Sequence, residues 1–523
     1  MSTGALLRRR SVRGATALRG GQARRPSPYQ VLGLLFWLVM SLAYWRVPLC
    51  CDAGQHAAVI ERLRADLLHP RHPTADLPGA GSPYYSPYAV AEGVLARLTG
   101  LPGWDVLRLA GPLNLLVLLT GLGRFVRLLT GRPWAPVLAL GAMTLLWGTE
   151  RTWWSGYLGL MSMTGGLGRP SAFAMGLALW AWALTGERAR DAGPVRFVGP
   201  NGLRGCCGYA ALGVLYGVIL LVHPITSVAA GAGAVACVAG WQRGWRPRVA
   251  GRWVLTGAVA VAVAVSWPYF DVFDVFATVG AGRLDQLHRV RHDDLGGRFW
   301  LALLGLPALW ARARRSRGRD PLVLMFLLDC LVVACGRLSG HFAYGPVLGP
   351  ALLGGQVALA VELTAARPWA PWRRVLGVLA AAGACLGLLT VQAGAVVPRS
   401  LDPVGFPQPP RWPTYGWAAR HMRRGDVVLA DGYYALHSIA GYGVNLVAPA
   451  RPDGALDERT RRRRSDDVRA YLDARTTRAG RSAVVHRYHV RWLLLTPRRK
   501  VPGEAVVVAW SLRTGEVLAR VGG

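Results

Sequence analysis

The sequence of 523 residues contains few charged side chains and almost no lysine. Charged residues make up 17% of the chain, whereas soluble domains contain about 25%. Lys500 is the only lysine, and acidic residues number 28 against 61 basic ones. Because 52% of the residues are hydrophobic, the composition excludes both a soluble globular enzyme and an intrinsically disordered chain.

Several motifs of soluble enzymes are also absent. The chain has no Walker A sequence, which excludes a P-loop ATPase. None of its eight cysteines forms a CxxC pair. The adjacent pairs Cys50-Cys51 and Cys206-Cys207 have poor geometry for disulfides, and we interpret them as apolar filler. No internal repeat is evident, which disfavours a transporter built from inverted repeats.

The sequence does contain a series of long apolar runs. A bilayer core of about 30 Å needs roughly 20 apolar helical residues. Eleven runs are predicted to be transmembrane helices, namely 31–49, 106–122, 135–148, 171–185, 206–222, 228–241, 253–270, 299–311, 321–338, 347–364 and 375–397. The stretch 148–169 is interpreted as an outer loop or a re-entrant segment. The predicted fold is therefore a polytopic α-helical membrane protein.

Arginines predict the orientation of these helices. They gather in the basic segment 1–29 and in the loops after the second, fourth, sixth, eighth and tenth runs. All of these lie on one side of the membrane if the N-terminus is cytoplasmic, which is the positive-inside pattern. The net charge of +33 therefore predicts a multi-pass protein of the cytoplasmic membrane that contacts membrane lipids, and not a nucleic-acid-binding protein.

The outer loops carry the groups that are suited to catalysis. Seven histidines fall outside or at outer helix ends, and the short inner loops have none. The first outer loop, residues 50–105, begins with Asp52 and His56 directly after the first run. Burial at the top of a helix is expected to raise the pKa of Asp52 and to suit it to general-base work. With His56 four residues later, the pair is placed to share a proton or a metal ion. Alternatively, Asp52 only caps an interfacial helix.

A second large outer loop, residues 271–298, is rich in cationic groups. Arg289, Arg291 and His292 are predicted to bind phosphate, because guanidinium and imidazolium groups neutralise it. His288 and His292 also have the spacing of two metal ligands on a helix, but the sequence assures no third ligand. A solvated loop without a role is the remaining interpretation.

A third group of polar residues lies at or within the predicted helices. The outer end of the run 321–338 carries Arg337, His341 and Tyr344. Together these side chains suit the binding of an anionic headgroup. Alternatively, Arg337 only extends its charged end towards the membrane interface. Asp329 and Glu362 lie inside predicted helices. Acids in such positions are candidates for a proton relay or for hydrogen bonds between helices.

The composition changes after residue 397. Residues 398–413 form a proline-rich linker, and residues 414–523 alternate predicted strands and helices, which indicates a small α/β domain. The predicted helices are 414–422, 433–440 and 466–475, and the predicted strands are 426–431, 443–448, 490–496, 506–511 and 516–521. Eleven spans after a cytoplasmic N-terminus predict an extracytoplasmic domain.

These features together resemble the GT-C superfamily of polytopic membrane glycosyltransferases, in particular its uncharacterised actinobacterial-type members. The similarity rests on the transmembrane region 30–397 with its acid at the start of the first outer loop. It rests also on the tail sequence GDVVLADGYYALHSIAGYGVNLVAP, followed by RRRRSDDVRAYLDA and HRYHVRWLLLTP.

The resemblance implies inverting sugar transfer from a polyprenyl-phosphate-linked donor to a glycan or cell-wall acceptor at the outer membrane face. Asp52 would be the general base, with His56 beside it. Arg337 and His341 would hold the donor phosphate, with the cations of the second loop as alternates. No cofactor is predicted, since a divalent metal has no clear ligand set.

Two other functions fit the sequence. A transporter or flippase of lipid-linked glycans would use the intramembrane acids Asp329 and Glu362. A non-catalytic protein of cell-envelope assembly would use its basic tail to bind cell-wall polymer.

Overall fold

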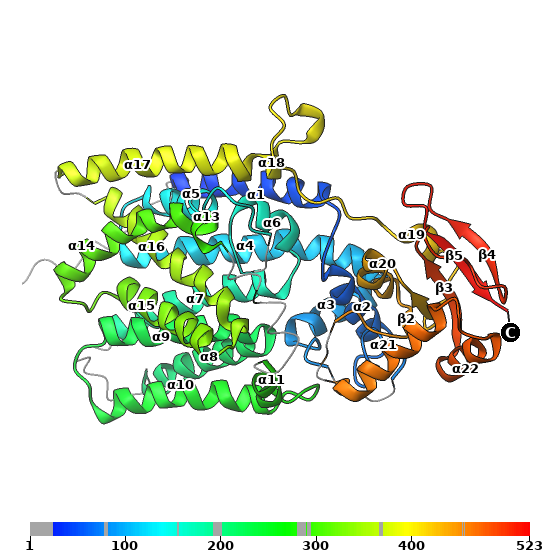
Figure 1. Ribbon diagram of the computed structural model, residues 1–523. Coiled ribbons are helices and arrows are strands. Elements are labelled where there is room, and N and C mark those ends of the chain that lie inside the picture. The colour runs from blue at the N-terminus through cyan, green and yellow to red at the C-terminus, as the bar shows by residue number, and fades with distance from the viewer. Residues whose placement is uncertain are drawn as a thin grey trace, which may run out of the picture.

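The computed structural model describes residues 25–523, except for 78–81, 154–155, 192–200, 280–288, 290–293, 366–369, 452, 454 and 523. A bundle of long helices makes up most of the molecule, and a small domain with a β-sheet covers one end of it (Figure 1). The basic N-terminal segment lies almost wholly outside the described residues.

A helix lies over each of the eleven predicted apolar runs. These helices are α1 (Pro28–Arg46), α4 (Gly103–Leu129), α5 (Ala135–Leu145), α7 (Pro170–Asp191), α8 (Asn201–Val222), α9 (Pro224–Trp241), α10 (Pro247–Val265), α14 (Leu306–Ser316), α15 (Pro321–Leu338), α16 (Leu348–Leu363) and α17 (Pro371–Gly387), the last continuing through η4 (Leu388–Gln392) and α18 (Ala393–Val396). Among the described residues, seven helices are long and apolar enough to cross a membrane. The protein is therefore a multi-pass membrane protein, as predicted.

Small residues let these helices approach closely. A Cβ atom on Gly121 of α4 would lie 2.8 Å from the backbone oxygen of Gly176 on α7, so larger side chains do not fit there. Close backbone contact of this kind is typical of helices packed in a membrane. The predicted span 299–311 is not one continuous helix. It contains a 3-10 turn, η2 (Trp300–Gly305), at whose end Gly305 packs directly against the backbone of Gly355.

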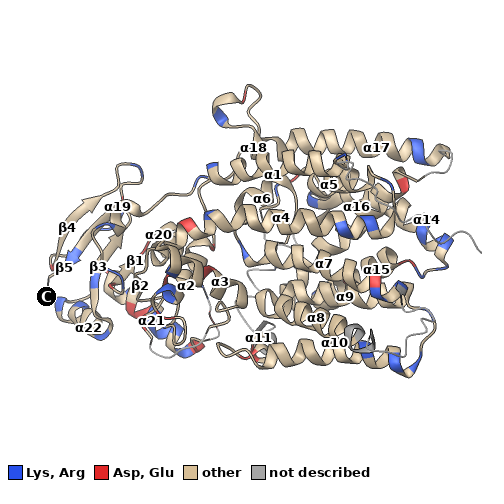
Figure 2. Cartoon of the chain, turned by 180° about the vertical axis from the view of Figure 1, so that it is seen from behind, with Lys and Arg blue, Asp and Glu red and all other residues tan. Residues whose placement is uncertain are grey.

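The first outer loop folds into two helices, α2 (Ala53–Ala65) and α3 (Pro87–Thr99). They lie at the same end of the bundle as the tail domain. Arginines gather at the opposite end, around α14 and α17 (Figure 2). The segment 148–169 contains a short buried helix, α6 (Leu160–Gly166), which packs against α1 and α18. This segment therefore enters the bundle rather than forming an exposed loop.

The tail domain is built on a five-stranded sheet with the order β2-β1-β3-β5-β4. The strands are β1 (Val427–Ala430), β2 (Asn445–Leu446), β3 (Val490–Leu495), β4 (Ala505–Trp510) and β5 (Val517–Val521). β1 is parallel to β2 and β3, whereas β5 runs antiparallel to β3 and β4. All five predicted strands are thus present, some of them shorter than predicted.

The helices of the tail domain differ more from the prediction. They are α19 (Gly416–Ala419), α20 (Tyr433–Ser438), η6 (Ile439–Tyr442), α21 (Glu458–Leu472) and α22 (Arg478–Tyr488). The predicted helix 466–475 begins earlier, at Glu458, because the side chain of Asp457 caps it by accepting from the backbone N–H of Thr460 at 2.8 Å. The helix α22 was not predicted.

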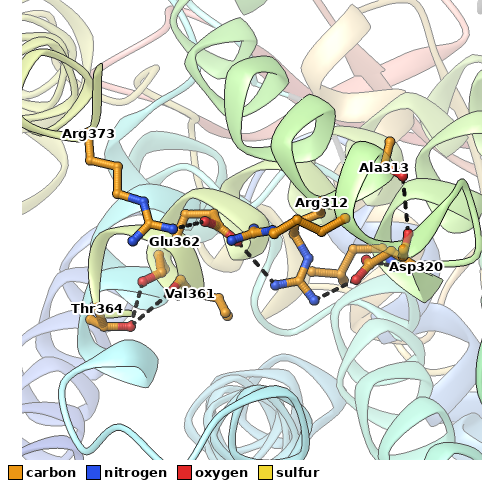
Figure 3. A network of polar contacts seen from close by, with 11 residues as sticks. Arg312, Ala313, Asp320, Val361, Glu362, Thr364 and Arg373 are labelled. Carbon is orange, nitrogen blue, oxygen red and sulfur yellow. Dashed lines mark hydrogen bonds and ion pairs between the residues drawn. The ribbon is translucent and has the colours of Figure 1, made fainter. Parts of the chain in front are cut away.

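The bundle end away from the tail domain is held by ion pairs around Glu362 of α16 (Figure 3). One carboxylate oxygen accepts a hydrogen bond of 3.0 Å from Arg373, and the other lies 3.6 Å from Arg312 and pairs with Arg315. Arg312 also pairs with Asp320 at 2.7 Å. Of the two interpretations of Glu362, these contacts favour a structural link between helices over a proton relay.

Candidate active site

Asp52 lies where the chain turns from the first transmembrane helix into α2. The preceding residue, Cys51, has a left-handed backbone with φ 69°, a conformation that costs roughly 1–2 kcal/mol for a residue with a side chain. The Asp52 side chain makes no capping hydrogen bond to α2. Asp52 thus occupies the N-cap position of α2, as in the alternative interpretation, but its carboxylate does not cap the helix and pairs with a distant side chain instead.

The carboxylate of Asp52 forms an ion pair with Arg169. The distance from Nε of Arg169 to the Asp52 oxygen is 2.9 Å, and the arginine is 8% exposed. The turn between α6 and α7 holds this arginine, whose backbone N–H donates to the carbonyl of Gly166 at 3.0 Å. The segment 148–169 therefore enters the bundle and brings a buried cation to the acid.

This ion pair determines the protonation of Asp52. Burial disfavours the carboxylate, but the charges of Arg169, Arg451 and His56 outweigh burial and hold the pKa of Asp52 well below its ordinary value. The expectation of a raised pKa is thus wrong, because the sequence gives no sign of a guanidinium 117 positions away at 2.9 Å. Asp52 is a carboxylate at any physiological pH.

His56 lies one turn further along α2. Burial lowers its pKa to about 4, and Arg169 and Arg451 act in the same direction against the attraction of Asp52. The imidazole is therefore neutral near pH 7. Its ring meets the ring of Tyr84 edge to face, with centroids 5.8 Å apart. The structure thus brings the two predicted catalytic residues together as an anion and a neutral base.

The described neighbour of the Asp52 carboxylate is a cation that belongs to the protein itself. Within the described part of the chain, no group of three or more His, Cys, Asp or Glu side chains is placed to hold one. The nearest partner of the carboxylate is moreover a guanidinium, and a divalent cation beside it would be repelled.

The tail domain supplies the rest of the site. A Cβ on Gly54 would lie 2.0 Å from the carbonyl oxygen of His437, so α2 packs directly on the end of α20. Arg451 is close enough to lower the pKa of both Asp52 and His56. Its Nε is buried, and no described residue accepts a hydrogen bond from it. The guanidinium therefore retains donors for a ligand.

A buried polar cluster fixes the segment that carries Arg451. Ser82 of the first loop donates to Asp453 at 2.7 Å, and Nε2 of His72 lies 3.5 Å from the same carboxylate. Nδ1 of His72 accepts from the backbone N–H groups of Thr74 and Ala75, which places the ring proton on Nε2, facing Asp453. The first loop and the tail domain are thereby joined two residues from Arg451.

The predicted phosphate-binding residues form a separate group. Arg337 and His341 are exposed where α15 ends, and Tyr344 is partly buried in the turn η3 (Phe342–Val347). The guanidinium of Arg289 lies 5.9 Å from the ring of Phe342, so the second outer loop reaches this group. Two further predicted residues lie outside the described residues, namely Arg291 and His292.

The loop before α6 lies between this group and Asp52. Trp153 donates to the Sγ atom of Cys50 at 3.1 Å. A Cβ on Gly349, just after η3, would lie 2.5 Å from the carbonyl oxygen of Gly156. The two groups of polar residues therefore border the same segment.

Sequence reasoning missed Arg451 beside Asp52, and it also missed the buried acid Glu92 of α3. Glu92 of α3 is 7% exposed, and burial raises its pKa to about 8, partly offset by a hydrogen bond with Tyr88. An acid within the amphipathic α3 gives no sequence signal of such burial. Arg451 follows a strand of a distant domain, so only the fold places it beside Asp52.

Fold and site together define a multi-pass membrane protein in which a half-buried carboxylate pairs with an arginine of the bundle, next to an arginine of the α/β domain. No protein-family model matches the chain, and no curated protein matches it by sequence. Solved structures do match. The arabinofuranosyltransferase AftD from Mycobacteria aligns with 94% of this chain at 16% identity and a TM-score of 0.57, over 40% of its own length.

Two other solved structures give the same result. The oligosaccharyltransferase AglB from Archaeoglobus fulgidus, in complex with an inhibitory peptide and a dolichol-phosphate, aligns with 89% of this chain and 69% of its own, at 12% identity and a TM-score of 0.53. ArnT from Cupriavidus metallidurans aligns with 94% of this chain and 97% of its own, at 15% identity and a TM-score of 0.50. The chain has the GT-C fold, as predicted, and it spans less than half the length of AftD.

Proposed function

We propose that the protein is a membrane glycosyltransferase that moves a sugar from a polyprenyl-phosphate-linked donor to an acceptor hydroxyl. The observation that carries the proposal is the half-buried carboxylate of Asp52, which pairs with Arg169 and lies within the electrostatic influence of Arg451, at the end of a bundle with the GT-C fold. The fold is shared with an oligosaccharyltransferase solved with dolichol-phosphate and with an arabinofuranosyltransferase, which supports both the reaction and a lipid-phosphate donor.

In the proposed reaction Asp52 acts as the general base. The acceptor oxygen forms a bond to the anomeric carbon while the bond from that carbon to the phosphate oxygen breaks, which inverts the configuration. The acceptor proton passes to Asp52, and polyprenyl phosphate leaves with the bonding electrons. A carboxylate of low pKa is a weak base, so proton transfer is expected late, as positive charge develops on the acceptor oxygen.

Arg451 is the proposed contact for the donor phosphate, because no residue in the described part of the chain accepts a hydrogen bond from its buried Nε. Arg169 is the second cation within reach, and a phosphate drawing on its donors would weaken its hold on Asp52 and raise the basicity of that carboxylate. Arg337, His341, Tyr344 and Arg289 remain a proposed site for the lipid-linked headgroup. Arg451→Ala and Arg337→Ala distinguish the two, since the variant that loses the phosphate contact raises the KM for the donor.

We also propose that the site faces away from the cytoplasm. Arg314 and Arg315 of α14 lie at the bundle end opposite to the tail domain, and the positive-inside rule places such residues in the cytoplasm. A C-terminal reporter that is active only outside the cytoplasm should then be active, whereas activity of a cytoplasmic reporter would contradict this orientation.

The proposed function is tested with Asp52→Asn in membranes supplied in turn with polyprenyl-phosphate-linked hexoses and pentoses. Loss of a general base should lower the release of polyprenyl phosphate by about 10²- to 10⁴-fold. Asp66→Asn is a matched control, because Asp66 is an exposed acid at the other end of α2. Equal release by the Asp52 variant and the wild type would overturn the assignment of Asp52.

A further inference from the structure

Four ring side chains form a cluster on the tail domain beside the candidate site. Trp412 comes from the linker, and Tyr433, Tyr434 and His437 come from α20. The two tyrosines are 62% and 43% exposed. A contiguous group of exposed aromatic side chains is a candidate binding surface.

The cluster is held rigidly. Nε1 of Trp412 donates to the hydroxyl of Ser438 at 2.8 Å, and Nδ1 of His437 lies 2.7 Å from the carbonyl oxygen of Tyr433. The Trp412 and Tyr434 rings stand at 86° with centroids 4.8 Å apart, and Tyr433 and Tyr434 stand at 80°. Rings packed edge to face in this way leave faces open to a ligand that is stacked on them.

The position of the cluster connects it to Asp52. α20 packs on the first turn of α2 through the contact between Gly54 and His437. The charge of Asp52 reaches His437, and the cluster also lies within the electrostatic influence of Arg451. A molecule lying on the rings is therefore placed beside the proposed base.

We propose that this cluster is the subsite for a carbohydrate acceptor. The faces of the rings would stack on the C–H faces of sugar rings, while the tyrosine hydroxyls and the imidazole hydrogen-bond sugar hydroxyls. The inference rests on the proposed transfer reaction and names the class of its acceptor.

The chemistry of the cluster favours a sugar over a lipid or an apolar peptide. Its members combine an apolar ring with a polar rim and, near neutral pH, carry no formal charge. Aliphatic side chains are exposed elsewhere on the domain, on β4 at Val506, Val507 and Val508, where a purely hydrophobic partner would bind better. A neutral polyhydroxylated chain matches the cluster.

The experiment measures saturation transfer by NMR from the full-length protein in nanodiscs to soluble neutral hexasaccharides, with maltohexaose, cellohexaose and xylohexaose as probes. At least one probe should bind at about 10 mM, and Tyr433→Ala and Tyr434→Ala should each weaken it by about 2- to 10-fold. Trp510→Ala is the matched control, because Trp510 is a 64% exposed aromatic residue on β4. In transfer assays the tyrosine variants should raise the KM for the acceptor and leave kcat nearly unchanged.

Three results would overturn the inference. The first is no NMR saturation transfer to any of the three probes. The second is equal saturation transfer in the wild type and the tyrosine variants. The third is that the tyrosine variants keep their binding to the sugars and instead lose binding to empty phospholipid vesicles or to an apolar peptide. Failure of the proposed function gives a different pattern. The wild type and Asp52→Asn would then both bind a hexasaccharide through the tyrosines, and neither would release polyprenyl phosphate from any donor.

Discussion

Removing the cation beside Asp52 tests the geometry of the site without knowledge of the substrate. Arg169→Gln keeps a side chain of similar length and a hydrogen-bond donor but removes the charge. Asp52 then becomes a mostly buried carboxylate whose nearest cation is missing. We expect the variant to be less stable near pH 8 and its loss of stability to shrink as the pH falls.

The magnitude follows from the distance of 2.9 Å. At an effective dielectric constant of about 20, two unit charges at this separation interact by about 6 kcal/mol, an upper limit for a pair that water partly reaches. Breaking a buried pair from one side costs about 3–5 kcal/mol. The pKa of Asp52 should rise by two or more units in the variant, so acidification protonates the orphaned carboxylate and relieves part of the cost.

The assay is thermal unfolding of the purified protein in nanodiscs at pH 5 and pH 8, for the wild type, Arg169→Gln, Asp52→Asn and the double variant. Each single variant leaves one charge of the Asp52–Arg169 pair without its partner, whereas the double variant removes both charges of the pair. The double variant should therefore lose less stability at pH 8 than the two single variants together. Strictly additive losses, with no dependence on pH, would refute the ion pair and the low pKa derived from it.

Three further predictions follow from the same site. The folded-state pKa of Glu92, at about 8, lies above its ordinary value of 4.5. The folded protein therefore loses stability as the pH rises between these two values. Glu92→Gln should remove this loss and raise the unfolding midpoint at pH 8 but not at pH 4.5. Asp453→Asn should lower the unfolding midpoint by weakening the contacts of Ser82 and His72, at a cost of about 1–3 kcal/mol, and should raise the KM for the donor through Arg451, whereas an unchanged KM would contradict the positioning role. Because a guanidinium occupies the place beside Asp52, treatment with EDTA should leave the transfer rate unchanged, and a loss that Mg²⁺ or Mn²⁺ restores would contradict this.

Local patterns predicted the helices and strands because each depends on neighbouring residues. The run 321–338 coincides with α15 because Asp320 caps it, Pro321 opens it, and every turn is apolar. The run 299–311 failed to predict one helix, because Pro307 at the start of α14 has no N–H to continue a helix from η2, where Gly305 packs on Gly355. The early start of α21 at the Asp457 cap was missed, because the arginine-rich run that follows it also fits a solvated loop.

The candidate site was predicted only in part, for the same physical reason. Asp52 can be picked out from the sequence because it is an acid directly after an apolar run. His56 can be picked out because it lies only four residues further along. The pKa of Asp52, in contrast, depends on Arg169 and Arg451, which lie far away in the sequence. The sign of the shift was therefore wrong even though the residue was found. The aromatic residues of α20 can be read from the sequence, but their position beside Asp52 depends on the packing of α20 on α2.

The docking of the tail domain also argues against a tail that works alone. Ala58 of α2 belongs to the same hydrophobic cluster as Tyr415 and Val428 of the tail domain. A Cβ on Gly441 would lie 2.9 Å from the ring of Trp104 at the start of α4, so the two parts meet without room for larger side chains. A separated tail would expose this apolar surface to water and would lose the partners of Arg451 and Asp453. A non-catalytic role confined to the tail is therefore hard to reconcile with its core, which the membrane domain helps to build.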